Sequence, residues 1–375
     1  MTIGLGGCSR LRPKPPTQYV YVTAKQTFLR DRVAAVSNRT ATVENGDKLQ
    51  VLEHGRKFVR VQTAKGEQGW IEEKAVATQE VFDQFDALKQ EHKTDPTVAS
   101  AVVRDEVYLH IKPGRDTEKF FRLAEGEKLK LLTRATLLKP LPPGTKAAVK
   151  PAAPVAGKGG KAQTPAPDVA APPAMEDWWL VRDSKGDTGW LLSRYMDVDA
   201  PDSITRYAEG QRVVGAYVLT TVNDPEAEQA DKNIPIYVTV MSPYKAGLTY
   251  DFDQVRVFTW SVKKHRYETG FRDKNIEGYL PVTVTMATDP YGKSAAATTP
   301  APTFSYRVLS GEAGPVIPDA VTGAIVPQKT ILKTYRLESN LVRRVIQPGT
   351  PTGGEAHPAP ALEKKGKPQG RAKRR

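Results

Sequence analysis

The stretch DWWLVRDSKGDTGWLLSRY at residues 177–195 has a looser copy, KFVRVQTAKGEQGWIEEKA, at residues 57–75. Gly66 corresponds to Gly186 and Trp70 to Trp190, both at an offset of 120. Each copy is typical of two short strands joined by a tight turn, because glycine after lysine supplies the positive φ of such a turn. The duplication therefore predicts two related β modules.

A second matching pair of segments defines where the copies differ. VENGDKLQVL at 43–52 corresponds to LAEGEKLKLL at 123–132 with an offset of only 80, so the second copy contains about 40 additional residues. The insert, placed at 135–175, consists mostly of Pro, Ala, Gly, Lys and Thr. Such a composition has too little apolar bulk for a core, so we expect this insert to be disordered.

The segment between the copies predicts a helix. In ATQEVFDQFDALKQEHK at 77–93, the apolar residues Val81, Phe82, Phe85 and Leu88 have helical spacing. Asp95 followed by Pro96 should end this linker helix.

The region after residue 204 contains many strand-like segments rich in Val, Thr, Tyr and Phe, such as RVVGAYVLTTV and IPIYVTVMSP. VRVFTWSVKKHRYETGF predicts a hairpin that turns near Lys263 and Lys264. About 145 residues of this texture favour one all-β, sandwich-like domain.

The chain is thus expected to be all-β, with two small β modules joined by a short helix and followed by a β-sandwich-like domain. The expected parts are an N-terminal tether at 1–19, a first module at 20–77, a linker helix at 78–98, a second module at 102–199 with the insert at 135–175, an all-β domain at 204–346, and a disordered basic tail at 347–375.

The two modules resemble SH3-like barrels of the bacterial extracellular type (SH3b), on the motifs ENGDKLQVLE, AEGEKLKLL and the Gly-Trp pair after each Lys-Gly turn. The resemblance implies a ligand groove in the second copy formed by Trp178, Leu192 and Tyr195. The first copy has Phe58 and Ala75 at two of these positions, so we expect it to be mainly structural. The alternative is that Trp178, Trp190 and Tyr195 only pack the barrel.

The only cysteine, Cys8, lies in LGGC, which resembles the lipobox of bacterial lipoproteins. That resemblance implies a lipid anchor on Cys8 and a place in the cell envelope, facing the periplasm. Ser9 after the cysteine implies the outer membrane. Only MTIG precedes LGGC, which is too short for a signal peptide, so this expectation requires a start upstream of Met1. The alternative is a chance cysteine in a frayed terminus.

Composition narrows the possible functions. The 375 residues carry a net charge of +13, which favours anionic partners, but no basic run is interleaved with aromatics as in nucleic-acid binders. No apolar run reaches membrane-span length. The five histidines lack metal-site spacing and no catalytic motif is present, so we expect no enzyme, no metal and no cofactor.

Three hypotheses remain from the sequence. The first is a non-catalytic, envelope-anchored protein that binds peptidoglycan or an envelope protein, and no nucleic acid. The second is a structural or assembly component whose groove is not used. The third is a hydrolase with its site at 204–346, because acidic pairs in that region allow carboxylate chemistry.

Overall fold

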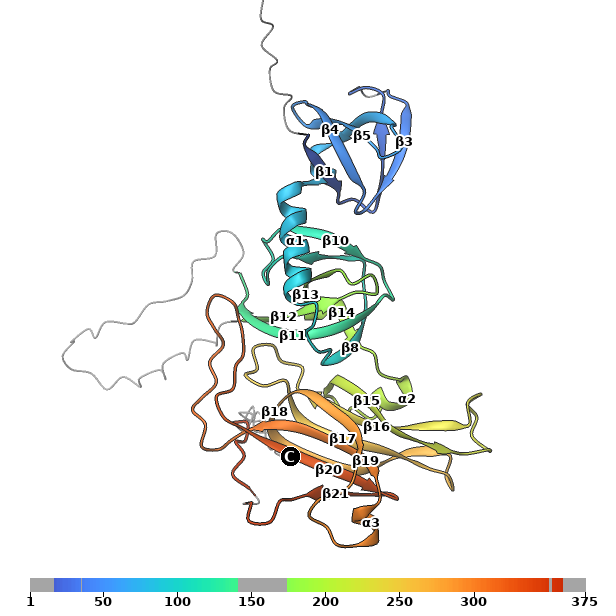
Figure 1. Ribbon diagram of the computed structural model, residues 1–375, viewed down its shortest axis with the longest axis vertical. Coiled ribbons are helices and arrows are strands. Elements are labelled where there is room, and N and C mark those ends of the chain that lie inside the picture. Colours follow the sequence, from blue (N-terminus) through green and yellow to red (C-terminus); the bar gives the residue numbers. More distant parts are fainter. Residues whose placement is uncertain (1–16, 35, 141–173, 351–352, 360–375) are drawn as a thin grey trace, which may run out of the picture. The chain divides into compact units, whose positions relative to one another are not determined.

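The computed structural model describes residues 17–34, 36–140, 174–350 and 353–359 (Figure 1). Its regular structure is mostly β, in three seven-stranded antiparallel sheets, so the all-β prediction is confirmed. Among the described residues, no helix is long and apolar enough to cross a membrane.

The first sheet forms the first repeat, which we define as Tyr19–Thr78. Its strands are β1 (Tyr19–Val22), β2 (Gln26–Arg30), β3 (Arg39–Glu44), β4 (Lys48–His54), β5 (Phe58–Gln62), β6 (Gln68–Glu72) and β7 (Val76–Thr78). They lie in the order β3-β2-β6-β5-β4-β1-β7. Alternate strand residues such as Leu29, Val59, Val61 and Ile71 face inward and form its apolar core.

The second sheet repeats this architecture. Its strands are β8 (Ala99–Val103), β9 (Val107–His110), β10 (Lys119–Leu123), β11 (Lys128–Leu138), β12 (Met175–Arg182), β13 (Thr188–Leu192) and β14 (Met196–Val198). Their order, β10-β9-β13-β12-β11-β8-β14, is the order of the first sheet shifted by seven strands. The β5–β6 hairpin pairs Phe58 with Glu72, and the β12–β13 hairpin pairs Trp178 with Leu192. The sequence duplication is therefore also a structural duplication.

Two pairs of equivalent glycines explain why the two copies share the same spacing. Gly66 and Gly186 in the hairpin turns have φ of 86° and 87°, as the turn prediction required. Gly69 and Gly189 instead lie where strands approach closely. A Cβ on Gly69 would be 2.7 Å from Leu29 Cβ, and one on Gly189 would be 2.7 Å from Leu109 Cβ. Each Gly-Trp motif therefore has glycine because no side chain fits there.

The predicted linker helix is present as α1 (Gln79–Glu91), but it ends at Glu91, before Asp95 and Pro96. Thr78 caps it by accepting a hydrogen bond from the Val81 amide, and Phe85 is fully buried. Phe82 stacks on Tyr21 of the first repeat with ring centres 3.9 Å apart, and it meets Phe120 of the second repeat edge-on at 5.8 Å. These aromatic contacts fix the helix against strands of both repeats.

The structure moves both boundaries of the insert. Strand β11 continues to Leu138 and β12 begins at Met175, so residues 135–138 and 175 are strand and not insert. Ala135 and Thr136 are buried, which explains why the strand extends past the repeat boundary. Residues 141–173 of the insert lie outside the described residues.

The chain forms two compact units. The first contains the described chain up to Pro96 together with Val102–Leu129 and Trp178–Asp197. The second contains Thr97–Ala101, the described parts of Lys130–Asp177, and the described chain from Val198. The ends of β11 and β12 are therefore grouped with the C-terminal β-domain.

The third sheet is one continuous meander in chain order. Its strands are β15 (Arg212–Asn223), β16 (Asn233–Ser242), β17 (Phe252–Ser261), β18 (Arg266–Ala287), β19 (Ala301–Leu309), β20 (Thr330–Glu338) and β21 (Leu341–Val345). Short helices α2 (Asp202–Thr205) and α3 (Ala295–Thr298) flank it. The hairpin predicted near Lys263 and Lys264 is confirmed by the β17–β18 pairing.

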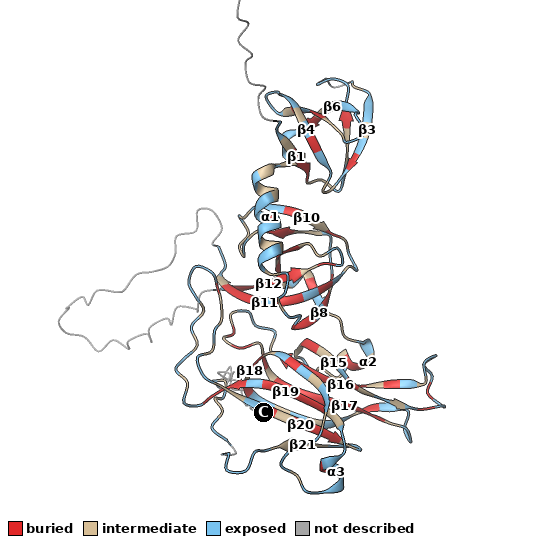
Figure 2. Ribbon diagram, viewed as in Figure 1, coloured by how far each residue is buried: buried red, intermediate tan, exposed pale blue. Residues whose placement is uncertain are grey.

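The β-domain encloses its core by curling. Strand β15 also contacts β18 and β19, so one sheet curls over the core, where two separate sheets would form a sandwich. Strands β16 and β17 are buried along most of their length (Figure 2). Phe252, Phe304 and Tyr306 are among the buried residues of this core.

The expected tail boundary at 347 also shifts. Residues 353–359 are attached to the β-domain, because Glu355 forms a β-bridge with Ser310 and its carboxylate lies 2.9 Å from the buried ammonium of Lys333. His357 Nδ1 lies 2.6 Å from the carbonyl oxygen of Asn275. The remaining tail, from residue 360, lies outside the described residues.

Candidate ligand-binding surface

The three groove residues expected in the second repeat occupy adjoining positions. Trp178 in β12 pairs with Leu192 at the end of β13, and Tyr195 lies in the 3₁₀ turn η2 (Ser193–Tyr195) that follows. Trp178 is 2% exposed and Leu192 6% exposed, whereas Tyr195 is half-buried. The burial of Trp178 favours the packing alternative for this side chain. The role of Tyr195 in binding stays a prediction.

His110 packs against Trp178 in the second repeat. Its ring meets the indole edge-on, with centroids 5.0 Å apart, and its Nδ1 lies 2.9 Å from the Thr117 hydroxyl oxygen. Burial, followed by the positive charge of Lys119, lowers the pKa of His110 to about 4. The imidazole is therefore neutral near pH 7 and belongs to the interior.

Tyr195 is enclosed on one side by its neighbour in the chain. The Arg194 guanidinium lies 4.6 Å from the centre of the tyrosine ring, and it also donates a hydrogen bond to the Tyr195 hydroxyl. The Tyr195 carbonyl accepts a hydrogen bond from the Arg104 amide at 2.8 Å. The hydroxyl, the carbonyl oxygen and one ring contact of Tyr195 are thus already used within the repeat.

The first repeat carries an aromatic hollow of about 260 Å³. Three half-buried rings line it: Phe28 from β2, Phe58 from β5 and Trp70 from β6. Ala75, at the position equivalent to Tyr195, also lines it. We call this feature the hollow. The loss of the tyrosine, which led us to expect a mainly structural first copy, leaves a concave apolar surface.

The hollow differs from the second repeat in one cross-strand partner. Arg30 pairs with Trp70 in the first repeat, and His110 pairs with Trp190 in the second. His110 is buried against Trp178, whereas Arg30 is exposed and donates a hydrogen bond to the Ser37 hydroxyl at 2.9 Å. The position that holds the buried His110 ring in the second repeat therefore holds the outward-facing Arg30 side chain in the first.

Sequence reasoning did not single out Phe28. It lies in QTFLR at 26–30, where Leu29 is buried, so Phe28 and Arg30 face the other side of the strand. In the sequence, the alternation of inward- and outward-facing residues around Leu29 is the signal that places Phe28 on the outer face of this strand. The exposure of Phe28 also required knowing that Trp70 lies on the neighbouring strand.

The surroundings of the hollow are positively charged. Arg30 and Lys74 line it, and the guanidinium of Arg39 lies 3.8 Å above the centre of the Phe28 ring. Glu72 is the carboxylate among its lining residues, and it lies 2.7 Å from the Lys74 ammonium. Three cations therefore face one anion at this surface.

A cleft of about 1010 Å³ adjoins the hollow. Its walls come from the last residues of the first repeat, from the first turns of α1, and from the second repeat near Tyr108 and Lys119. Ala24, Lys74 and Ala75 line both the cleft and the hollow. The two depressions are therefore neighbours within the first compact unit, separated by the residues that they share.

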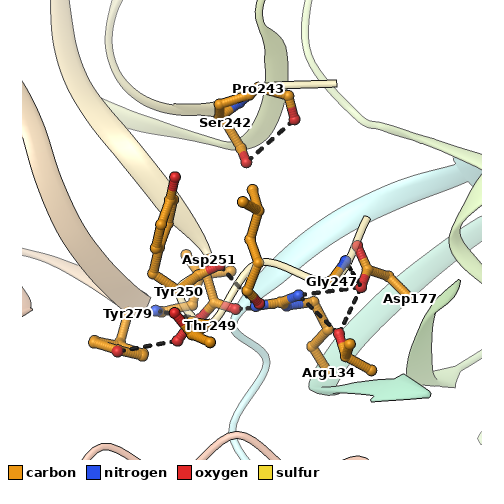
Figure 3. A network of polar contacts seen from close by, with 12 residues as sticks. Arg134, Asp177, Ser242, Pro243, Gly247, Thr249, Tyr250, Asp251 and Tyr279 are labelled. Carbon is orange, nitrogen blue, oxygen red and sulfur yellow. Dashed lines mark hydrogen bonds and ion pairs between the residues drawn. The ribbon is translucent and has the colours of Figure 1, made fainter. Parts of the chain in front are cut away.

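A buried ionic network surrounds Arg134 in the second unit (Figure 3). The guanidinium lies 2.9 Å from an Asp251 carboxylate oxygen and 3.4 Å from one of Asp177, and it donates to the carbonyls of Leu248 and Tyr250. Thr136 and the Gly247 amide donate to the same Asp177 oxygen. These contacts attach the end of β11 to the loop before β17, which is a structural role.

Two further polar clusters lie in the β-domain, the region of the hydrolase alternative. Asp273 accepts hydrogen bonds from the Tyr306 hydroxyl and the Lys333 ammonium, both at 2.6 Å. Asp224 is fully buried and accepts from the Trp260 indole at 2.7 Å, while His265 Nδ1 lies 2.8 Å away. Both carboxylates are engaged by their neighbours in this structure.

Among residues 17–34, 36–140, 174–350 and 353–359, no three His, Cys, Asp or Glu side chains gather as metal ligands would. Cys8, the expected lipidation residue, lies outside the described residues, so the anchor stays a prediction.

Comparison with known proteins identifies no family. No family model matches the sequence, and no curated protein matches it. Solved structures with local similarity include NlpC2 from Trichomonas vaginalis, at 9% identity and a TM-score of 0.15 over 52% of this chain and 55% of that one. An NlpC/P60 family protein from Bacillus cereus is 9% identical with a TM-score of 0.22, over 67% of this chain and 98% of that one. NlpC1 from Trichomonas vaginalis is 9% identical with a TM-score of 0.15, over 71% and 93%. Similarities at these scores carry no argument about fold or activity.

Proposed function

We propose that this chain is a non-catalytic binding protein of the cell envelope, anchored by lipid at Cys8, in which SH3-like modules contact a wall component or a protein partner. The observation that carries the proposal is the hollow of the first repeat. Phe28, Phe58 and Trp70 surround a volume that suits an inserted side chain or small group. Partly exposed aromatic rings in a concave site provide much of the binding energy of such modules.

The sequence placed the binding groove in the second repeat, whereas we now assign binding to the first repeat. Trp178 and Leu192 are buried in the second repeat, so of the expected groove residues Tyr195 has the most accessible surface. In the first repeat, three aromatic side chains line an open depression. We therefore expect loss of binding when the hollow is changed, and little effect when Tyr195 is changed.

The test is retention on purified peptidoglycan and on immobilised envelope extract. We expect Phe58→Ala and Trp70→Ala to lose retention, and Tyr195→Ala to keep it. Circular dichroism melts of each variant would separate lost binding from lost folding. Retention that depends on Tyr195 and not on Phe58 would return the site to the second repeat. Retention that depends on none of them would contradict the hollow.

A structural or assembly role is the second candidate. It is favoured by the buried Arg134 network and by the aromatic contacts of α1, which hold neighbouring elements together. An anchored spacer would retain nothing on peptidoglycan or envelope extract, yet its loss would disturb the assembly of other envelope proteins. The anchor itself predicts a diacylated N-terminal peptide at Cys8 in mass spectra of membrane fractions.

A further inference from the structure

We propose that the hollow and the cleft form one groove that binds an extended acidic peptide, which adds a strand to the edge of β7. This inference rests on the proposed function, since it names the class of ligand for the same aromatic surface. It adds three features: the length of the site, the backbone contact and the charge of the ligand.

The length follows from the shared lining. Ala24, Lys74 and Ala75 belong to both depressions, and two of these three side chains are methyl groups. We infer that a ligand can cross these small side chains from the hollow to the wider cleft, where Val81 and Gln84 of α1 form one wall. A ligand longer than one side chain can therefore occupy both parts.

The peptide character follows from the edge of a sheet. Strand β7 is the last strand of the first sheet and pairs only with β1 among the described strands. Its residues Val76–Thr78 line the cleft. The outer edge of such a strand presents backbone groups at the spacing of another strand, although the Val76 amide already donates to the Glu73 carbonyl oxygen and is not free for a ligand. A peptide matches this spacing along its whole length, whereas a glycan or an oligonucleotide has no equivalent row of amides.

The acidic character follows from the distribution of charge. At the hollow, Arg30, Arg39 and Lys74 outnumber Glu72. In the cleft, Lys74 and Lys119 are balanced by Glu80 and Glu118. Complementarity therefore places the acidic residues of the ligand at the hollow and neutral residues in the cleft.

The same contacts argue against a nucleic acid. Arg39 already covers one face of the Phe28 ring, so this ring offers less surface for stacking a base. Base-stacking sites need open aromatic faces, each receiving one base. An aromatic or aliphatic side chain entering between Phe28, Phe58 and Trp70 requires no open stacking face.

The experiment begins with random decapeptides displayed on phage and selected on the full-length chain. A parallel selection uses the Phe58→Ala, Trp70→Ala double variant. We expect the wild type alone to enrich peptides that combine Asp or Glu with a large apolar residue. The strongest peptide is then synthesised in three forms: unchanged, with Asn and Gln in place of Asp and Glu, and with alternate backbone amides methylated.

Affinities of the three forms separate the parts of the proposal. We expect amidation of the carboxylates and methylation of the backbone each to raise Kd at least about tenfold. A second variant, Arg30→Gln with Arg39→Gln, changes two exposed or ring-stacked cations at the hollow. It should bind the acidic and amidated forms equally, and added salt should weaken the acidic form on wild type only.

Each negative result would overturn a different part of the proposal. Equal binding of the acidic and amidated peptides by wild type would overturn the acidic class, and indifference to methylation would overturn strand addition. Binding of soluble peptidoglycan fragments or oligo(dT) at the hollow, without any enriched peptide, would overturn the peptide class and leave the hollow as a binding site. If neither selection enriches a peptide and neither polymer binds, both this inference and the proposed function fail.

Discussion

The imidazole of His110 lies edge-on to the indole of Trp178, 5.0 Å away, in the interior of the second repeat. The equivalent pair in the first repeat is Arg30 and Phe58, which both line the open hollow. Histidine at this position therefore accompanies a filled interior in the second repeat. Arginine at the equivalent position accompanies an accessible aromatic surface in the first.

His110 and His265 should titrate on opposite sides of pH 6.5. Burial and Lys119 lower the pKa of His110 to about 4, whereas the hydrogen bond to the Asp224 carboxylate raises the pKa of His265. NMR of histidine-labelled protein, with His110→Gln and His265→Gln for assignment, would measure both. A His110 resonance that titrates near 6.5 would contradict its burial against Trp178.

The His110 shift has a consequence for stability. A histidine whose pKa is depressed on folding makes the folded state less stable as pH falls below 6.5, because the unfolded chain then binds a proton that the folded chain excludes until about pH 4. The full shift corresponds to roughly 3 kcal/mol. Urea unfolding between pH 7 and pH 4 should show a smaller acid loss in His110→Gln than in wild type.

Alanine at the glycine of either Gly-Trp motif should destabilise its repeat. In Gly69→Ala the new Cβ would meet Leu29 Cβ at 2.7 Å and the Arg30 carbonyl oxygen at 3.0 Å. Such overpacking costs about 1 to 3 kcal/mol. Gly314→Ala is the control, because its Cβ would meet nothing within 4 Å. Equal melting temperatures for the two variants would show that the strands separate easily at Gly69.

Removal of Arg134 should be among the most damaging single changes in the second unit. Its side chain is 6% exposed, and its loss leaves Asp177 and Asp251 without their shared cation. Breaking such a buried pair costs about 3 to 5 kcal/mol. Arg104→Ala is the matched control, since its pair with Asp197 is 53% and 63% exposed and is worth about 0 to 1 kcal/mol. Urea midpoints would compare the two.

Truncation of Trp178 should destabilise the fold far more than truncation of Tyr195. Trp178→Ala removes a side chain that is 2% exposed and creates a cavity, at a cost of about 3 to 5 kcal/mol. Tyr195→Ala removes a half-buried ring on a short turn, for which a much smaller loss of melting temperature is expected. A larger loss for Tyr195 would give that residue a structural role.

The sequence by itself determined the local elements. The offsets of 80 and 120 revealed the duplication, and the strand order and hairpin registers repeat accordingly. The Lys-Gly turns, the helix at 79–91 and the hairpin at 263–264 follow from backbone φ, from helical spacing and from strand alternation. These signals act over a few residues, so one chain is enough to read them.

The tertiary structure decided where the domains end and which aromatic residues remain accessible. Ala135 and Glu355 fall in segments of low-complexity or tail-like sequence, yet each joins the β-domain through a partner far along the chain, Ala324 and Lys333. Phe58 and Trp178 hold equivalent positions in the same hairpin register, so local pattern cannot distinguish them. Their burial differs because His110, 68 positions before Trp178, packs on the indole, while Arg30 points into solvent. A contact across that separation forms only when the sheet closes, which is why the accessible surface could not be assigned from the sequence.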